Sequence, residues 1–469
     1  MEELEKILEE AISELRPQEE ERYEALKIYE EVKRLVEESL RIPYDFTVEL
    51  HGSVAKGTEL KGMMDLDVFL LIRYDDINRE WLERDIVKPL FEVFKEFYRE
   101  VKLKYATHPY IHISLGKYEV DVVPAYWAKD ISEIKTAVDR TPFHTKYVLS
   151  KLTEDMKDEV RLLKAFFKSA GVYGAEIKVE GFSGYLTELL AIKYGSFLNA
   201  VTNIARWRFG EVVIVDESIA KIDRSYLKKV FKAPLVVLDP VDPKRNAASA
   251  VSAESLARVV LASSIFLQKP SKELIVSGVR VPEVDNIESM CHAITSSGRE
   301  AIGVLFKLAG EIVPDVLWGK LRSATNSLIS SLRRAGFTVV SYSIWSDECF
   351  KAFLTITVLP KELPSHEVHL GPPLGRIADI KSFVLKYSLN DKSFGPYVSH
   401  SGRIFTLRKR KHTQPYQVIE EQLNSLKLGA GISILGVLKN VGEVCEYIKQ
   451  HKNPELVLAF RKAAKLELF

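Results

Sequence analysis

The residues best suited to chemistry lie in one short stretch near the N-terminus. Gly52 and Ser53 are followed, twelve residues after Ser53, by Asp65-Leu66-Asp67 at the start of an apolar run. Because side chains alternate along a strand, Asp65 and Asp67 point to the same face. Two adjacent carboxylates repel each other, and a divalent cation that prefers oxygen ligands, such as Mg²⁺, relieves this repulsion. The pair predicts a metal site; the alternative is an acidic pair on a solvated strand.

The Gly52-Ser53 turn is the second part of this pattern. It precedes a short predicted helix, where backbone N–H groups and a hydroxyl can bind an anion. Lys56 follows within one helical turn and adds a positive charge. A phosphate site beside a metal site is the combination that phosphoryl transfer requires.

A third carboxylate, Asp121, interrupts the otherwise apolar stretch of residues 118–123. Burying it there costs several kcal/mol unless it is paired or bound to a metal. If this stretch lies beside Asp67, three carboxylates meet, which suits a two-metal site with ions about 4 Å apart. We therefore predict that Asp65, Asp67 and Asp121 are catalytic, and we place Glu119 on the opposite face.

The bulk composition limits the class of protein. The chain has 469 residues and a formal net charge of +1, so we expect several domains and only local basic surfaces. The sequence contains neither a signal-peptide pattern nor an apolar run of about 20 residues, so we expect a cytoplasmic protein that does not span a membrane. Cys291, Cys349 and Cys445 lie far apart, which argues against a zinc site or a disulfide scaffold and fits a reducing compartment.

Strand and helix patterns alternate in the first third of the chain and become helical in the middle. The early pattern predicts two helices within residues 2–40, strands at 47–50, 67–72, 108–115 and 118–123, and a helix at 78–100. The middle predicts helices at 156–170, 183–197 and 253–268. The last part predicts helices at 315–335, 416–427 and 454–464, and strands at 337–345 and 349–359. The fold class is therefore a multidomain α+β protein.

The order of these motifs resembles that of the nucleotidyltransferase superfamily that includes DNA polymerase β. Within it, the chain resembles the class I, archaeal CCA-adding enzymes. The matching segments are His51-Gly52-Ser53, Asp65 and Asp67, His108-Pro109-Tyr110, Glu119 to Pro124, Asp139 to His144, Tyr173 to Glu176, Gly181 to Tyr185, and Asp239 to Asn246. The bacterial and eukaryotic class has an Arg-Arg-Asp motif, which is absent from this sequence.

This resemblance implies an activity: template-independent addition of C, C and A to the 3′ end of tRNA from CTP and ATP. It also implies two Mg²⁺ ions, a homodimer, and contacts with the acceptor stem and TΨC arm of tRNA. A poly(A) polymerase or an oligoadenylate synthetase shares the carboxylate triad and remains an alternative. A noncatalytic RNA-binding protein with the same fold is a second alternative.

The resemblance also assigns residues that surround the nucleotide. Ser53 and Lys56 would contact the triphosphate, together with Lys164 and Tyr173 from the second domain. Lysine is a flexible point charge that suits phosphate binding, although the family often has arginine at the Lys56 position. From helical periodicity alone, Lys164 would be an ordinary exposed residue of an amphipathic helix.

Four further residues are implied on the sugar and base side. His108, Thr141 and His144 would line the sugar, whose 2′-hydroxyl both donates and accepts hydrogen bonds. Arg245 follows a rigid two-proline loop and would help to read the base. The alternative for Arg245 is a local ion pair with Asp239 or Asp242.

The same comparison divides the chain into four domains. These are a head at 1–145 that resembles a polymerase palm, a helical neck at 146–268, a body at 269–320 with 415–469, and an α+β tail at 321–414. A basic run in the tail could bind RNA phosphates, although most charge runs are simply solvated. The predicted RNA-binding residues are Arg403, Arg408, Lys409, Arg410 and Lys411.

Overall fold

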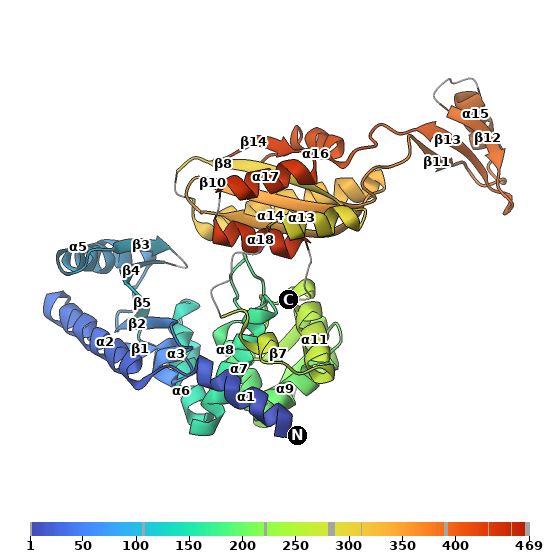
Figure 1. Cartoon of the computed structure of the whole chain (residues 1–469). Coiled ribbons are helices and arrows are strands. Elements are labelled where there is room, and N and C mark those ends of the chain that lie inside the picture. The colour runs from blue at the N-terminus through green and yellow to red at the C-terminus, as the bar shows by residue number, and fades with distance from the viewer. Residues whose placement is uncertain are drawn as a thin grey trace. The chain divides into compact units, whose positions relative to one another are not determined.

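The structure is a computed structural model (Figure 1). It describes residues 2–105, 108–219, 223–279, 287–310, 312–388, 393–429, 431–451 and 453–464. The chain forms two compact units, which meet in the sequence near residue 281, and each is described by itself. The multidomain α+β prediction is confirmed.

A five-stranded sheet forms the first part of unit 1, in the order β1-β2-β5-β4-β3. The strands are β1 (Phe46–His51), β2 (Met64–Ile72), β3 (Val101–Tyr105), β4 (Pro109–Leu115) and β5 (Tyr118–Tyr126). β2 and β5 are parallel, whereas the other neighbouring pairs are antiparallel. β2 lies inside the sheet, between β1 and β5, and its apolar residues from Leu66 to Ile72 are buried, which explains the near-continuous apolar run in the sequence.

Helices bury one face of this sheet. α2 (Glu19–Ser39) packs on β1 and β2, and it contacts α5 (Lys88–Phe97). Their apolar side chains share one core with the sheet. The single helix expected at 78–100 is instead α4 (Arg79–Trp81), a π-helical turn η1 (Leu82–Val87) and α5. The helical segment ends at Phe97 because residues 101–105 form the edge strand β3. The sequence analysis missed this strand, in which lysines alternate with apolar residues.

The rest of unit 1 is mainly helical. Its helices are α1 (Glu2–Leu15), α6 (Thr141–Lys151), α7 (Glu154–Ser169), α8 (Gly184–Tyr194), α9 (Phe197–Ile204), α10 (Arg224–Phe231), α11 (Ala253–Gln268) and α12 (Glu273–Val276). Three of these helices, α8, α9 and α11, begin at a serine cap. The side chains of Ser183, Ser196 and Ser252 each accept a hydrogen bond from a backbone N–H in the first turn. A parallel pair, β6 (Glu211–Ile214) and β7 (Leu235–Leu238), packs against α10.

The helical core of unit 1 also includes the first helix of the chain. α1 packs on α7 and α12 and contributes Ala11 and Leu15 to the neck core. Phenylalanines from several helices fill the same core, among them Phe166, Phe197 and Phe266, which contact one another edge to face. The predicted head at 1–145 thus begins with a helix that packs on the neck.

Unit 2 is built around a four-stranded antiparallel sheet in the order β14-β8-β10-β9. The strands are β8 (Glu300–Leu308), β9 (Thr338–Ser346), β10 (Lys351–Leu359) and β14 (Ile432–Leu438). The helices are α13 (Ile287–Ser296), α14 (Pro314–Ala335), α16 (Pro415–Leu423), α17 (Val441–His451) and α18 (Pro454–Ala464). The proposed boundary at residue 321 therefore divides one sheet, because β10 pairs with β8 from the segment assigned to the body, and β9 pairs with β10.

A second, three-stranded sheet lies within the predicted tail segment, in the order β11-β13-β12. Its strands are β11 (His366–Leu370), β12 (Ser393–Val398) and β13 (Ile404–Lys409), and α15 (Ile377–Ser388) packs on one side. His369 of β11 contacts the rings of Phe383 and Tyr387 on α15. In the part of the chain that the structure describes, no helix is long and apolar enough to cross a membrane.

The cysteines depart from the sequence-based expectation. Cys291 of α13 and Cys445 of α17 form a disulfide, with their Cα atoms 6.4 Å apart, although 154 residues separate them in the sequence. Cys349 is free and exposed. The sequence argued against a disulfide scaffold, and it did not predict this single cross-link, because spacing in sequence does not reveal that α13 and α17 pack side by side.

The disulfide predicts a redox-dependent stability. Because the cross-link closes a long loop, Cys291→Ser should lower the free energy of unfolding by about 2–4 kcal/mol. Cys349→Ser, which removes the free thiol, is the matched control and should leave stability unchanged. Thermal unfolding with and without reductant measures both; equal melting temperatures for Cys291→Ser and the oxidised wild type would contradict the cross-link.

Candidate active site

The pairing of β2 with β5 brings the predicted carboxylates together. Asp67 lies opposite Asp121 and Asp65 lies opposite Glu119 in this parallel register. On the other side of β2, His51 of β1 lies opposite Asp67. The sheet thus positions all three predicted catalytic carboxylates on two neighbouring strands.

The proximity of these carboxylates shows in their ionisation. Burial and the negative charges of Asp121 and Asp65 raise the pKa of Asp67 to about 7. Burial and the charge of Asp121 also raise the pKa of Asp65. The ionised carboxylates repel one another, and a divalent cation with oxygen ligands removes that repulsion. The donor set therefore fits Mg²⁺.

The side chains do not form a complete set of metal ligands in this conformation. Within the described ranges, no three His, Cys, Asp or Glu side chains are close enough together to hold a metal ion. Asp121 is turned towards a neighbour instead: its Oδ1 lies 2.6 Å from Nδ1 of His112 on β4. Nε2 of His112 lies 3.0 Å from a carboxylate oxygen of Glu119, which also accepts a hydrogen bond from Ser114 at 2.7 Å.

His112 and Glu119 are residues that the sequence analysis did not assign to the site. The expected place of Glu119 on the opposite face is wrong, because residues two apart on a strand share a face and Glu119 points the same way as Asp121. A histidine between two carboxylates orients both of them. The sequence analysis had predicted both strands of the β4–β5 hairpin. Counting back from the turn between them would have placed His112 opposite Asp121.

Gly52 allows the loop after β1 to approach Asp67. Its φ angle is +70°, and a Cβ at this position would lie 1.8 Å from Oδ2 of Asp67. Ser53 follows in the short helix α3 (Gly52–Lys56), which ends at Gly57 in the left-handed conformation. The sequence-predicted turn is therefore next to the sequence-predicted carboxylates.

Lys56 and Lys164 lie in one buried polar cluster with Glu188 of α8. Lys56 Nζ donates a hydrogen bond to Glu188 at 2.6 Å, and Lys164 Nζ lies 3.5 Å from the same carboxylate. Lys164 is therefore not the exposed helical residue that periodicity suggested. Tyr173 is nearby: burial and the charges of Glu188 and Asp65 raise its pKa well above the ordinary value.

Arg245 belongs to a second cluster, centred on the buried Asp239. Arg245 donates to Asp239 at 2.8 Å, Tyr185 donates to it at 2.9 Å, and Nε2 of His144 lies 3.2 Å away. The His144 ring stacks on Tyr185 with centroids 3.8 Å apart. Although burial raises the pKa of Asp239, the close contact with His144 and the hydrogen bond from Arg245 hold it below the ordinary value. The local ion pair considered for Arg245 is present.

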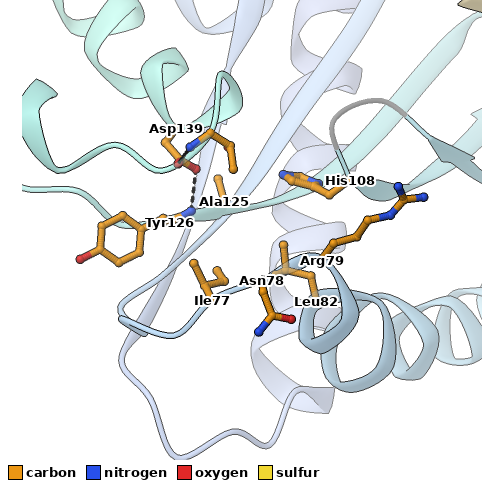
Figure 2. A pocket seen from close by; sticks show the side chains of 9 residues that line it. Ile77, Asn78, Arg79, Leu82, His108, Ala125, Tyr126 and Asp139 are labelled. Carbon is orange, nitrogen blue, oxygen red and sulfur yellow. Dashed lines mark hydrogen bonds between the residues drawn. The ribbon is translucent and has the colours of Figure 1, made fainter.

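His108 and Thr141 come from different places. Thr141 is the first residue of α6, whereas His108 precedes β4 and lines a cavity of about 70 Å³ (Figure 2). Arg79, Tyr126 and Asp139 also line this cavity. Burial lowers the pKa of His108. Asp139 accepts hydrogen bonds from three backbone N–H groups, one of them that of Tyr126, so it shapes the loop rather than the cavity's chemistry.

The basic run of the tail lies on β13 and just after it. Arg408 and Arg410 both bind Glu367, at 2.6 and 2.8 Å, and Lys411 binds Glu421. Arg403 and Lys409 are exposed. Part of the predicted RNA-binding charge is thus paired within the protein.

Three models of known protein families match successive segments of the chain. Residues 27–144 match the nucleotidyltransferase domain, residues 158–276 the second domain of tRNA nucleotidyltransferase, and residues 297–446 the C-terminal domain of CCA-adding enzymes. A CCA-adding enzyme of Pyrobaculum neutrophilum is 39% identical over 92% of this chain and 96% of its own length. The chain belongs to the CCA-adding enzyme family.

Other CCA-adding enzymes match over a similar length. That of Pyrobaculum islandicum is 38% identical over 87% of this chain and 91% of its own. That of Saccharolobus islandicus is 32% identical over 97% of this chain and 98% of its own. Among solved structures, a cytoplasmic RNA terminal U-transferase superposes with a TM-score of 0.45, at 16% identity, over 59% of this chain and 99% of that chain.

The contact between Gly52 and Asp67 predicts an activity defect in this CCA-adding enzyme. Gly52→Ala should reduce nucleotidyl transfer about 10²-fold, because the new Cβ displaces the Asp67 carboxylate. Gly62→Ala is a matched control: Gly62 has a φ of +69° but nothing within 4 Å of its Cβ position. Both variants lose about 1–2 kcal/mol of stability from the left-handed backbone. Equal transfer rates in the two variants would contradict the contact's role.

Proposed function

We propose that this protein adds C, C and A to the 3′ end of tRNA, using CTP and ATP and no nucleic-acid template. Membership of the CCA-adding enzyme family supports the reaction, and the register that pairs Asp67 with Asp121 supports the site. The 3′-hydroxyl of tRNA attacks the α-phosphate in line, and pyrophosphate leaves.

The protein's own residues would bind and orient the nucleotide. Ser53 and Lys56 lie beside the carboxylates and would bind the triphosphate, with Lys164 and Tyr173 on the neck side. Hydrogen bonds from fixed donors at this point favour the transition state because the donors need no reorganisation when charge moves.

On the sugar and base side, the roles of His108, Thr141, His144 and Arg245 remain proposals. The Asp239 cluster supports those of His144 and Arg245, because it fixes both side chains within hydrogen-bond distance of one carboxylate. A fixed guanidinium can present its remaining N–H donors to a base without losing further side-chain entropy.

Asp65, Asp67 and Asp121 would hold two Mg²⁺ ions. When bound, the ions would lower the pKa of the attacking hydroxyl and neutralise the charge of the triphosphate. The raised pKa of Asp67 supports this assignment, because burial and the neighbouring Asp121 and Asp65 disfavour its ionised form, and a bound cation would offset both effects.

The partners and location extend the proposal. The acceptor stem and TΨC arm of tRNA would be bound by the C-terminal unit, with Arg403, Arg408, Lys409, Arg410 and Lys411 in the contact. The exposure of Arg403 and Lys409 supports a phosphate contact there. We also propose a homodimer in the cytoplasm.

The alternative of a poly(A) polymerase or an oligoadenylate synthetase is not favoured. The match of residues 297–446 to the C-terminal domain of CCA-adding enzymes separates this chain from a protein that shares only the catalytic core.

The test is a gel assay with Mg²⁺ and tRNA transcripts that lack the CCA end. We expect two additions with CTP alone, and a third followed by arrest when ATP is also present. A long adenylate ladder with ATP would contradict the proposal and indicate a poly(A) polymerase.

Asp67→Ala serves as the catalytic control in the same assay. It should abolish transfer while the dissociation constant for tRNA stays within about twofold, because the carboxylate acts on the nucleotide rather than on the tRNA body. An equal loss of tRNA binding would contradict the metal-site account.

A further inference from the structure

We propose that Glu188 is a positioning residue for triphosphate binding: it holds the ammonium groups of Lys56 and Lys164 in place beneath the carboxylate site. The inference rests on the proposed function, in which these lysines bind the triphosphate. Neither sequence analysis nor the similarity to known enzymes assigned a role to Glu188.

Glu188 is surrounded by donors. Its Oε2 accepts a hydrogen bond from Lys56 at 2.6 Å, and its Oε1 accepts one from the Thr58 hydroxyl at 2.8 Å and lies 3.5 Å from Lys164 Nζ. Lys164 also donates to the carbonyl and the hydroxyl of Thr58, both at 3.0 Å. One carboxylate therefore links both lysines and the loop between them.

These groups are almost inaccessible to water. Glu188 is 1% exposed, Lys164 2% and Lys56 6%. A carboxylate or ammonium in such a place costs several kcal/mol unless it is paired. Two ammonium groups with one carboxylate leave a net positive charge in the cluster, which favours an anion such as a triphosphate beside it.

Burial disfavours the protonated form of a lysine. It lowers the pKa of Lys164, and Glu188 acts in the opposite direction and raises it. Although burial raises the pKa of Glu188 itself, the charges of Lys56 and Lys164 hold it below the ordinary value. Burial outweighs Glu188, so the pKa of Lys164 is lowered on balance, but the ionised carboxylate limits that lowering.

The cluster also joins two parts of unit 1. Lys56 and Thr58 follow β1 in the sheet domain, whereas Lys164 and Glu188 lie on the neck helices α7 and α8. Arg161 of α7 strengthens the junction by donating to the carbonyls of Gly57 and Glu59 at 2.6 and 2.9 Å. Glu188 therefore positions the triphosphate-binding loop from the neck side.

An alternative is that Glu188 competes with the triphosphate for the lysines. Lys56 uses one of its three N–H donors on Glu188, so donors remain for a phosphate. The two roles predict opposite effects of removing the carboxylate charge: weaker triphosphate binding if Glu188 positions the lysines, and tighter binding if it competes.

The experiment measures binding of CTP, inorganic pyrophosphate and cytidine to the full-length protein by calorimetry, with Mg²⁺ present. Glu188→Gln should weaken CTP and pyrophosphate binding about tenfold or more, because it removes the carboxylate charge that both buried ammonium groups contact. Cytidine binding should not change, since cytidine has no phosphate. Unchanged or tighter binding of pyrophosphate would overturn the proposal.

A matched control separates positioning from general damage. Glu159 is a half-buried carboxylate of the same neck, which accepts a hydrogen bond from the Phe197 backbone at 2.6 Å. Glu159→Gln should leave pyrophosphate binding unchanged. In a Lys56→Met background, Glu188→Gln should have a much smaller effect on pyrophosphate binding, since the two residues act as one unit.

Thr58→Val covers the case in which Glu188→Gln does not fold. This change removes the hydroxyl that links Glu188 to Lys164 and keeps all charges, so pyrophosphate should bind about threefold more weakly. Unchanged binding to folded Thr58→Val would overturn the proposal. The binding assay uses no tRNA, so it tests the role of Glu188 separately from CCA addition. If the wild-type protein failed to add CCA but Glu188→Gln still weakened pyrophosphate binding, only the proposed function would be rejected.

Discussion

Electrostatic repulsion between Asp67 and Asp121 is the constraint on which the site depends. Parallel pairing of β2 with β5 places them opposite each other, and because both are only partly exposed, water screens their charges less than at an open surface. The antiparallel neighbours β1 and β4 add His51 beside Asp67 and His112 beside Asp121. The sheet therefore builds a site of excess negative charge, which suits a reaction that brings divalent cations and a polyphosphate together.

The positive half of the site comes from the junction between the sheet and the neck helices. Lys56 lies in α3 after β1, and Lys164 lies on α7, so the proposed triphosphate site would be shared by two parts of the chain that fold around different cores. Glu188 and Arg161 fix this junction through carboxylate and carbonyl contacts. The three candidate metal-binding carboxylates thus lie on strands, whereas the two ammonium groups lie on helices, where the carboxylate of Glu188 pairs with them.

Local signals in the sequence were sufficient to predict which carboxylates lie together on neighbouring strands. Gly52, Asp65, Asp67 and Asp121 could be found because alternation along a strand and an acidic residue in an apolar run are local signals. Helices such as α11 and α14 were predicted within a residue or two of their bounds for the same reason.

Contacts between distant segments could not be predicted in this way. Glu188 lies among apolar residues of a helix whose periodicity indicates only burial, and its partner Lys56 is 132 residues away. The Cys291–Cys445 disulfide and the pairing of β8 with β10 likewise depend on which elements pack together, and no local pattern specifies that. Glu119 was misplaced through a local error, since alternation already puts it beside Asp121.

The most direct test of the central claim is a count of divalent ions bound in the presence of CTP. Electron paramagnetic resonance with Mn²⁺ as the probe gives the number of ions per chain for the wild type and for Asp121→Asn. The account predicts two ions for the wild type and fewer for the variant, because one carboxylate of the shared site is lost. An unchanged number of bound ions in a folded Asp121→Asn protein would contradict it.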